Sequence, residues 1–261
     1  MKPMRLELCT SPAVRDYLSR SRGIVWPIGS TEQHGPVGLL GTDHLCPQAI
    51  ARRFGEAHGV LVAPTLAVGN SHFHLGFPGS LALRPSTLMA VVMDHAAALE
   101  ATGFRRLYIL NGHGGNVAPI RTALAEFYAA RSFAGRHEPD GLVVRVRNWW
   151  DLPRTDALRR SLYGAGEGYH ATPSEIAITQ AAHPDHIGDV SHLAAPGNAG
   201  HADMTDHAGD NYAEAAGFAA RFPDGRVMSD SGLATRAHGE ALLAAAVEDL
   251  AADFAAFVDA H

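Results

Sequence analysis

The sequence contains few cysteines and few charged residues. Only two of its 261 residues are cysteine and 18% are charged, whereas 46% are hydrophobic. Two thiols cannot form the disulfide framework of a small secreted protein, and no uninterrupted apolar run is long enough to cross a membrane. The opening residues, MKPMRLELCT, lack the apolar stretch of a signal peptide. We therefore expect a cytoplasmic protein with no membrane partner.

The sequence also lacks a strongly basic region. Its formal net charge is −6, and Lys and Arg do not cluster. Because nucleic-acid binding needs a basic surface that neutralises phosphates, we expect no nucleic-acid partner. No internal repeat or interdomain linker is visible, and a chain of this length can bury the core of one large domain. We predict a single domain over residues 1–261.

Short apolar runs alternate with helical patterns along the chain. The apolar runs predict strands at 23–29, 60–69, 105–116 and 141–150, the third ending in a Gly-rich turn. The helical patterns lie at 44–59, 84–103, 118–132, 172–183 and 234–261, with a short helix around 211–220 inside a long loop region, 184–232. Pro27 is expected to mark the end of the first strand, and Ser86 or Thr87 to cap a helix. This alternation predicts an α/β fold with a largely parallel sheet.

Polar side chains follow three of the predicted strands. Glu32, His34 and Asp43 come after the first strand, and His113 lies in the motif NGHGGN at the end of the third. The segment EGYHATPSE, which ends at Glu175, follows the fourth strand and a short helix. In open α/β sheets, ligands bind beyond the carboxyl ends of the strands, so we expect these residues to form one site.

The residue types in these clusters indicate a metal centre. Carboxylates and imidazoles form a mixed nitrogen and oxygen ligand set that suits Zn, Mn or Fe. Five candidate ligands indicate two ions, and the carboxylate of Asp43 can bridge ions about 3.5–4 Å apart. Cys9 and Cys46 lack a ligand spacing such as C-x-x-C, and we expect Cys46 to be a buried, inert thiol.

Five motifs resemble, in the same order, those of the creatininase (creatinine amidohydrolase) family. They are PIGSTEQHGPVGLLGTDH, GNSHFHLGFPGSLAL, LNGHGGN, HATPSE and DSGLATRAHG, and the resemblance runs from about Ile24 to the final helix. It implies a three-layer α/β/α fold, two divalent metal ions and hydrolysis of a C–N bond in a small amide. It also implies a homo-oligomer, often a hexamer.

The resemblance also implies roles for the candidate ligands. Glu32, Asp43 and His113 correspond to the ligands of one ion, and His34 with Asp43 to ligands of the other. In creatininase itself a Tyr–Glu pair follows the NGH motif, and that Glu binds the second ion. This sequence has a Gly pair there, as many other family members do, and in those members the Glu that matches Glu175 is the expected substitute ligand.

Other residues of the matching motifs lie on the substrate side. The resemblance marks His170 and Glu175 as candidate catalytic residues. His170 is either a substrate clamp or a general acid, and it or a metal-associated acid would protonate the departing nitrogen. The candidate substrate-binding residues are Ser71, His74, Gly114 and Glu167. Phe73 stands where the family usually has an acidic residue. The mechanism expected is attack on the amide carbonyl by a water that two metal ions activate.

Several alternatives stay open at this level. Glu175 and Thr172 also match a capping box, a role compatible with metal binding. His170 matches a hydrogen-bonded loop histidine equally well, Ser71 and His74 could simply hold a Gly-rich loop, and the cluster at 201–210, HADMTDHAGD, fits a solvated loop better than a second metal site. For the function, the alternatives are a formamide deformylase, a small-peptide peptidase, and a metal-binding scaffold without catalytic activity.

Overall fold

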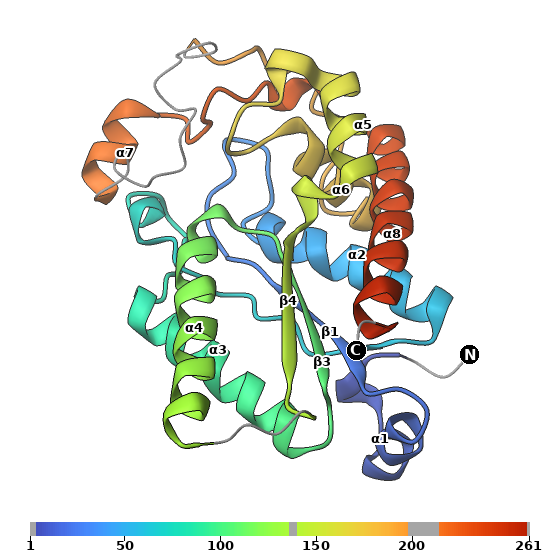
Figure 1. The fold of residues 1–261 in the computed structure, drawn as a ribbon. Coiled ribbons are helices and arrows are strands. Elements are labelled where there is room, and N and C mark those ends of the chain that lie inside the picture. Colours follow the sequence, from blue (N-terminus) through green and yellow to red (C-terminus); the bar gives the residue numbers. More distant parts are fainter. Residues whose placement is uncertain (1–3, 136–139, 198–213, 260–261) are drawn as a thin grey trace.

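The protein contains a four-stranded parallel sheet between two layers of helices (Figure 1). The structure is a computed structural model that describes residues 4–135, 140–197 and 214–259. The strands lie in the order β2-β1-β3-β4, with bounds Leu61–Val62, Gly23–Ile28, Arg106–Asn111 and Val143–Asn148. All neighbouring strands are parallel, which confirms the predicted fold class.

Helices cover both faces of the sheet. One face carries α2 (Thr42–His58), α5 (Pro153–Tyr163), α6 (Pro173–Ala182) and α8 (Arg236–Asp259). The other carries α1 (Ser11–Leu18), α3 (Pro85–Ala101) and α4 (Val117–Phe133). The short helix α7 (Ala215–Arg221) lies apart from both layers (Figure 1).

The two hydrophobic cores follow from the alternation of side chains along the central strands. In β1, Val25 faces the layer of α2 and α8, whereas Ile24 and Trp26 face the layer of α3 and α4. In β3, Tyr108 faces the layer of α2 and α8, and Leu107 faces the layer of α3 and α4. Because both faces are covered, the central residues of these strands form continuous apolar runs rather than alternating with polar residues.

Proline explains where the strand predictions were wrong. The run at 60–69 contributes only Leu61–Val62 to the sheet, because Pro64 has no N–H for the ladder. Pro27 lies inside β1 instead of at its end. It is tolerated because β2 has ended on that side, where the Pro27 carbonyl accepts a hydrogen bond from the Leu66 N–H at 3.1 Å.

Two helix starts also differ from the prediction. Helix α3 begins at Pro85, with Arg84 at the N-cap position and no side-chain cap from Ser86 or Thr87. Proline is favourable in the first helical turn, where its missing N–H has no partner to lose. Helix α1 was not predicted, although Thr10 caps it by accepting a hydrogen bond from the Ala13 N–H.

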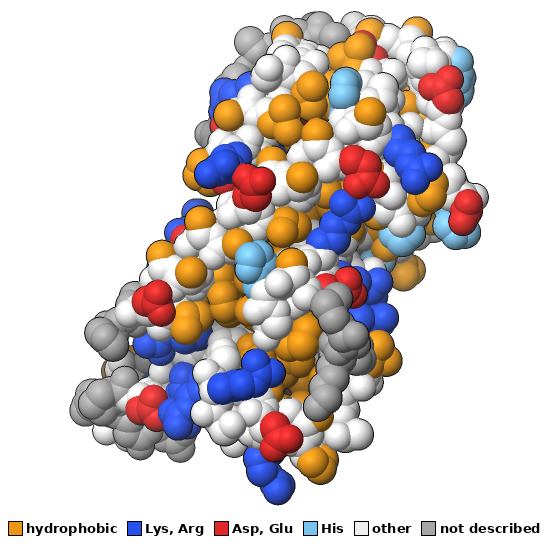
Figure 2. Space-filling model, turned by 90° about the vertical axis from the view of Figure 1, so that its right-hand side faces the viewer, with side chains coloured by type: hydrophobic (Ala, Val, Ile, Leu, Met, Phe, Trp, Pro, Cys, Tyr) orange, Lys and Arg blue, Asp and Glu red, His pale blue; other side chains and the backbone are white. Residues whose placement is uncertain are grey.

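Charges of both signs are mixed on the surface that α5 and α8 line. Figure 2 shows acidic and basic side chains interspersed there with apolar ones. Some of these charges pair between helices, as Arg154 does with Glu248 at 2.9 Å and Arg53 with Glu240 at 2.7 Å. No helix in the described part of the chain has the length and apolar character needed to span a membrane.

Candidate metal centre

The start of α2 fits between the ends of β1 and β3 because two glycines leave room for it. A Cβ atom at Gly29 would lie 2.3 Å from the Asp43 carbonyl oxygen, and one at Gly112 would lie 2.0 Å from it. Any side chain at either position would therefore displace the first turn of α2. This close approach places Asp43 at the carboxyl ends of two central strands, where the sequence predicts the site.

Asn116 connects the neighbouring loops. Its side-chain amide donates to the Gly29 carbonyl at 3.0 Å and accepts from the Asn70 N–H at 2.9 Å. The Asn70 carbonyl in turn accepts from Nε2 of His113 at 3.0 Å, because a carbonyl can only accept. His113 is thereby oriented with Nδ1 toward the carboxylates.

Acidic residues and histidines converge in three groups among the described residues. In each group the candidate ligand atoms lie within 4.8 Å of one another. The groups are Glu32 with Asp43 and His113, His34 with Asp43 and Glu175, and Glu32 with His74 and His170. The structure thus brings together all five predicted metal ligands, with Asp43 shared by two groups.

Asp43 lies between two histidines. Its Oδ1 is 3.0 Å from Nε2 of His34, and its Oδ2 is 2.9 Å from Nδ1 of His113. Glu32 Oε2 lies 3.4 Å from the same nitrogen of His113, and Glu175 Oε1 lies 3.9 Å from Nε2 of His34. Asp43 therefore presents one oxygen to each group, the geometry that a bridging carboxylate needs.

The carboxylates outweigh burial in setting the charge of the two histidines. Burial alone lowers the pKa of His34, but Asp43, Glu175 and Glu32 together raise it to about 10. For His113, burial acts in the same direction, and Glu32 and Asp43 raise its pKa to about 9. Burial raises the pKa of Asp43, but the two histidines hold it well below its usual range.

We expect the protein without metal to lose stability at alkaline pH. Because the folded-state pKa values of His34 and His113 lie above the ordinary 6.5, their stabilising protons are fully bound below about pH 6.5 and are lost as the pH rises through 9 and 10. Burial raises the pKa of Glu175 to about 7, which acts in the same direction. Thermal unfolding of chelator-treated protein from pH 6 to 10 measures the decline. The unfolding midpoint of Asp43→Asn should fall less over this range.

Three carboxylate oxygens in these groups accept no hydrogen bond among the described residues, although a histidine nitrogen lies within 3.4 Å of each. Glu32 Oε1, Glu32 Oε2 and Asp43 Oδ2 are buried and accept no hydrogen bond of good geometry from the described residues. A buried charge is costly unless it is paired or binds a metal. Oxygen atoms that accept no hydrogen bond, beside imidazole nitrogens, therefore fit a divalent cation.

The Glu175 side chain takes part in two sets of contacts, a helix cap and a group of candidate metal ligands. Its Oε1 accepts a hydrogen bond from the Thr172 N–H at 2.5 Å, and Thr172 Oγ1 accepts from the Glu175 N–H at 3.3 Å. This capping box begins α6, as the sequence allowed. Because Glu175 also belongs to the group of His34 and Asp43, the cap holds its carboxylate beside those residues.

The glycine pair after His113 leaves unequal room for side chains. A Cβ atom at Gly115 would lie 2.3 Å from the Asn70 carbonyl and 2.6 Å from Nε2 of His113. At Gly114, in contrast, no atom lies within 4 Å of the added carbon. The backbone at 115 therefore excludes a ligand side chain unless the loop moves.

Two predicted substrate-binding residues are engaged elsewhere. Ser71 is fully buried, and its hydroxyl donates to the Leu81 carbonyl at 2.8 Å and accepts from Ser30. Glu167 pairs with Arg159 at 2.9 Å and accepts a hydrogen bond from Ser174, and it belongs to none of the three groups. Burial raises the pKa of Glu167. Their contact with substrate stays a prediction.

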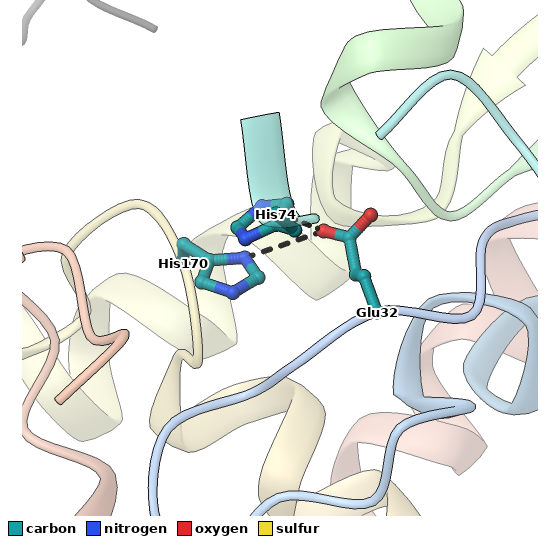
Figure 3. A group of neighbouring side chains, drawn as sticks. All are labelled: Glu32, His74 and His170. Atoms are coloured by element: carbon teal, nitrogen blue, oxygen red, sulfur yellow. Dashed lines mark ion pairs between the residues drawn. The ribbon is translucent and has the colours of Figure 1, made fainter. Parts of the chain in front are cut away.

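His74 and His170 both point toward Glu32 (Figure 3). His74 Nε2 lies 3.0 Å from Glu32 Oε1, and His170 Nδ1 lies 3.7 Å from the same oxygen. Burial, with smaller contributions from His74 and His34, holds the pKa of His170 well below its usual value. His170 is therefore a neutral imidazole near pH 7.

The prediction did not include Gln33, which the structure places in contact with both of these rings. Its Nε2 lies 2.9 Å from Nδ1 of His74 and 3.0 Å from Nε2 of His170. The only signal in the sequence was its position between Glu32 and His34.

Cys46 is buried, with a pKa raised well above normal by burial, which agrees with an inert thiol. The cluster at 201–210 lies outside the described residues.

The family model described as "Creatininase: Creatinine amidohydrolase" matches residues 7–254 of this chain. The chain belongs to the creatininase family. The match covers every element from α1 to α7 and residues 236–254 of α8, and it includes all three groups of candidate ligands. The family predicted from the sequence motifs is thereby confirmed.

Curated relatives in the creatininase family have different activities. The chain is 33% identical over 175 residues to a creatinine amidohydrolase of Pseudomonas putida, and 35% identical over 108 residues to a mycofactocin precursor peptide peptidase of Mycolicibacterium smegmatis. It is 29% identical over 143 residues to a 3-dehydro-scyllo-inosose hydrolase of Thermotoga maritima. These matches cover 62%, 39% and 54% of this chain and 65%, 43% and 43% of the relatives, less than two thirds of each.

Solved creatininase structures match the whole chain. The crystal structure of a creatinine amidohydrolase (creatininase) superposes with a TM-score of 0.82 at 26% identity, covering 100% of both chains. A mutant creatininase of Zn-Zn type and a creatininase with Mn both match with a TM-score of 0.77 at 26% identity. The first match covers 100% of this chain and the second 99%, and each covers 100% of the other chain. Family members of this fold therefore hold zinc or manganese.

Proposed function

We propose that this protein is a metal-dependent amidohydrolase that cleaves a C–N amide bond in a small molecule other than a peptide. The observation that carries the proposal is the set of buried oxygens on Glu32 and Asp43 that accept no hydrogen bond and lie among the nitrogens of His34 and His113 that face the site. Zinc and manganese in related structures support two divalent ions, as does the shared position of Asp43 in two groups. Iron fits the same ligand set.

The candidate ligands divide between two ions. Glu32, Asp43 and His113 would hold one ion, and His34, Asp43 and Glu175 the other. When bound, two such ions lower the pKa of a water molecule toward neutrality and polarise the substrate carbonyl. Glu175 takes the place of a ligand from the glycine pair, because Gly115 leaves no room for one.

His170 is the proposed proton carrier. Its Nε2 lies 2.7 Å from the Gln33 carbonyl, which can only accept, so Nε2 bears the proton of the neutral ring. Nδ1 therefore faces Glu32 with a free lone pair, where it can take a proton from the nucleophile and deliver it to the departing nitrogen. An amine leaves only after such protonation, because an amide anion is a very poor leaving group.

Metal analysis combined with a substrate screen tests this proposal. We expect about two equivalents of divalent metal per chain and hydrolysis of at least one compound among small cyclic amides, lactams and linear amides. Formamides and short peptides belong in the same screen, because a peptidase relative is 35% identical over 108 residues. Turnover confined to short peptides, or bound metal with no turnover of any C–N substrate, would contradict the proposal; the second result would favour a metal-binding scaffold.

A further inference from the structure

Backbone groups fix the orientation of the Gln33 side-chain amide. Oε1 accepts a hydrogen bond from the Gly35 N–H at 2.8 Å, and Nε2 donates to the Gly225 carbonyl at 3.0 Å. An N–H can only donate and a carbonyl can only accept, so these two partners identify the oxygen and nitrogen ends of the amide. Gln33 is also 95% buried, which excludes water as a competing partner.

The amide determines which nitrogen of His74 carries a proton. Gln33 Nε2 lies 2.9 Å from Nδ1 of His74, and an amide NH2 group can only donate. Nδ1 must therefore accept, and in a neutral imidazole the proton then lies on Nε2. His74 Nε2 is the nitrogen 3.0 Å from Glu32 Oε1, so this ring presents an N–H group to the site.

The other three histidines of the site are oriented the opposite way, with the protonated nitrogen of the neutral ring facing away from the carboxylates. Each places one ring nitrogen against a backbone carbonyl: His34 Nδ1 on Glu32 at 3.0 Å, His113 Nε2 on Asn70 at 3.0 Å, and His170 Nε2 on Gln33 at 2.7 Å. That carbonyl requires a proton on the nitrogen it contacts, so in the neutral ring the lone pair lies on the nitrogen facing the carboxylates. Metal-binding histidines are oriented in the same way.

One remaining contact of the amide is not a hydrogen bond in this assignment. His170 Nε2 lies 3.0 Å from Gln33 Nε2, but it already donates to the Gln33 carbonyl. The two amide protons of Gln33 go to Gly225 and His74, so none is left for His170.

Gly225 makes this arrangement possible. Its φ is +82°, and a Cβ atom there would lie 1.9 Å from Gln33 Oε1. The backbone of a segment 192 residues further along the chain thus approaches the amide closely enough to orient it. The amide of Gln33 is therefore held by a distant segment of the fold as well as by its sequence neighbour Gly35.

We infer that His74 turns an N–H group toward the metal centre and is not a ligand, and that Gln33 is the positioning residue that fixes which ring nitrogen carries this proton. The inference rests on the proposed function, since it concerns the same centre. It excludes the group of Glu32, His74 and His170 as a third cation site. Glu32 Oε1 then faces the His74 N–H, and Oε2 is left for the ion shared with Asp43 and His113.

Nitrogen NMR of the histidines tests the inference without any substrate. In protein labelled with 15N-histidine and loaded with 113Cd, we expect direct cadmium coupling at Nε2 of His34 and Nδ1 of His113. For His74 we expect a protonated Nε2 and no cadmium coupling at either nitrogen, both with and without the metal. A cadmium coupling at His74, or a proton on its Nδ1 in the wild-type chain, would overturn the inference.

Inverting the polarity of residue 33 provides the second test. Gln33→Glu keeps the size of the side chain but replaces the donor by an acceptor, so we expect the His74 proton to move from Nε2 to Nδ1. Gln180→Glu is the matched control, because Gln180 is another buried amide that donates to a carbonyl, that of Gly188 at 2.7 Å, and it lies outside the three groups. It should leave His74 unchanged.

The outcomes separate this inference from the proposed function. Absence of cadmium coupling at both His34 and His113 would contradict the metal centre itself. Coupling at those two residues together with coupling at His74 would contradict only the inference. A folded Gln33→Glu protein whose His74 keeps its proton on Nε2 would show that Gln33 does not set the polarity. If that variant does not fold, the wild-type spectrum still decides whether His74 is a donor or a ligand.

Discussion

Asp43→Asn is expected to abolish both metal binding and catalysis. The substitution keeps the size of the side chain but removes the charge that faces His34 at 3.0 Å and His113 at 2.9 Å. Because Asp43 contributes an oxygen to two groups, neither ion keeps its full ligand set. We expect metal content to fall from about two equivalents to less than one, and turnover to fall by more than about a thousandfold, or roughly 4 kcal/mol of transition-state stabilisation.

The matched control for this variant is Asp249→Asn. Asp249 is also a buried carboxylate, but it lies in α8 and accepts hydrogen bonds from the N–H and hydroxyl of Thr155 in the first turn of α5, both at 3.0 Å. Its loss should cost about 1–2 kcal/mol of folding free energy, as for other helix caps, and leave metal content unchanged. Elemental analysis and thermal unfolding of both variants give the comparison. Full metal content and turnover in Asp43→Asn would eliminate the proposed centre.

The convergence of the candidate metal ligands was predictable because it depends on strand ends. Glu32, His34, Asp43 and His113 follow the apolar runs of β1 and β3, and a parallel sheet brings the carboxyl ends of its strands to one edge. Glu175 was predictable as a helix cap from its spacing to Thr172. Its contact with His34 depends on how α6 packs against α2. That packing cannot be read from any local sequence pattern.

The hydrogen-bond polarity of the site was not predictable from local sequence. The amide of Gln33 is oriented by Gly225, which lies in a segment without a clear pattern and meets the site only through tertiary packing. The shortness of β2 and the start of α3 were missed for a more local reason. In both, a proline removes a backbone donor, and its effect depends on which neighbour that donor would have faced.

Glu175 connects the stability of α6 with the metal centre. Its carboxylate accepts from the Thr172 N–H in the capping box while it lies 3.9 Å from His34 Nε2. A helix cap restricts the side chain to one geometry before any ion binds, so less conformational entropy is lost on binding. The same packing encloses Cys46, whose thiol donates to the Glu175 carbonyl at 3.6 Å.

Gly112→Ala is expected to cause the largest loss of folding stability, and to disturb the metal centre with it. The new Cβ would lie 2.0 Å from the Asp43 carbonyl and 2.7 Å from Pro47 Cδ, and neither the backbone nor the proline ring can move freely. Overpacking of this kind costs about 1–3 kcal/mol, so the unfolding midpoint should fall by roughly 3–10 °C. Because the first turn of α2 must shift, Asp43 leaves its position between His34 and His113, and metal content falls too.

Gly114→Ala is the control two residues along the same loop. An added carbon there meets no atom within 4 Å, so we expect the unfolding midpoint and metal content to stay at their wild-type values. Thermal unfolding and elemental analysis of the two alanine variants, made side by side, separate the close approach of α2 from a general sensitivity of the Gly-rich turn. Equal losses in both variants would show that the turn tolerates no side chain, and that the contact between Gly112 and α2 is not what positions Asp43.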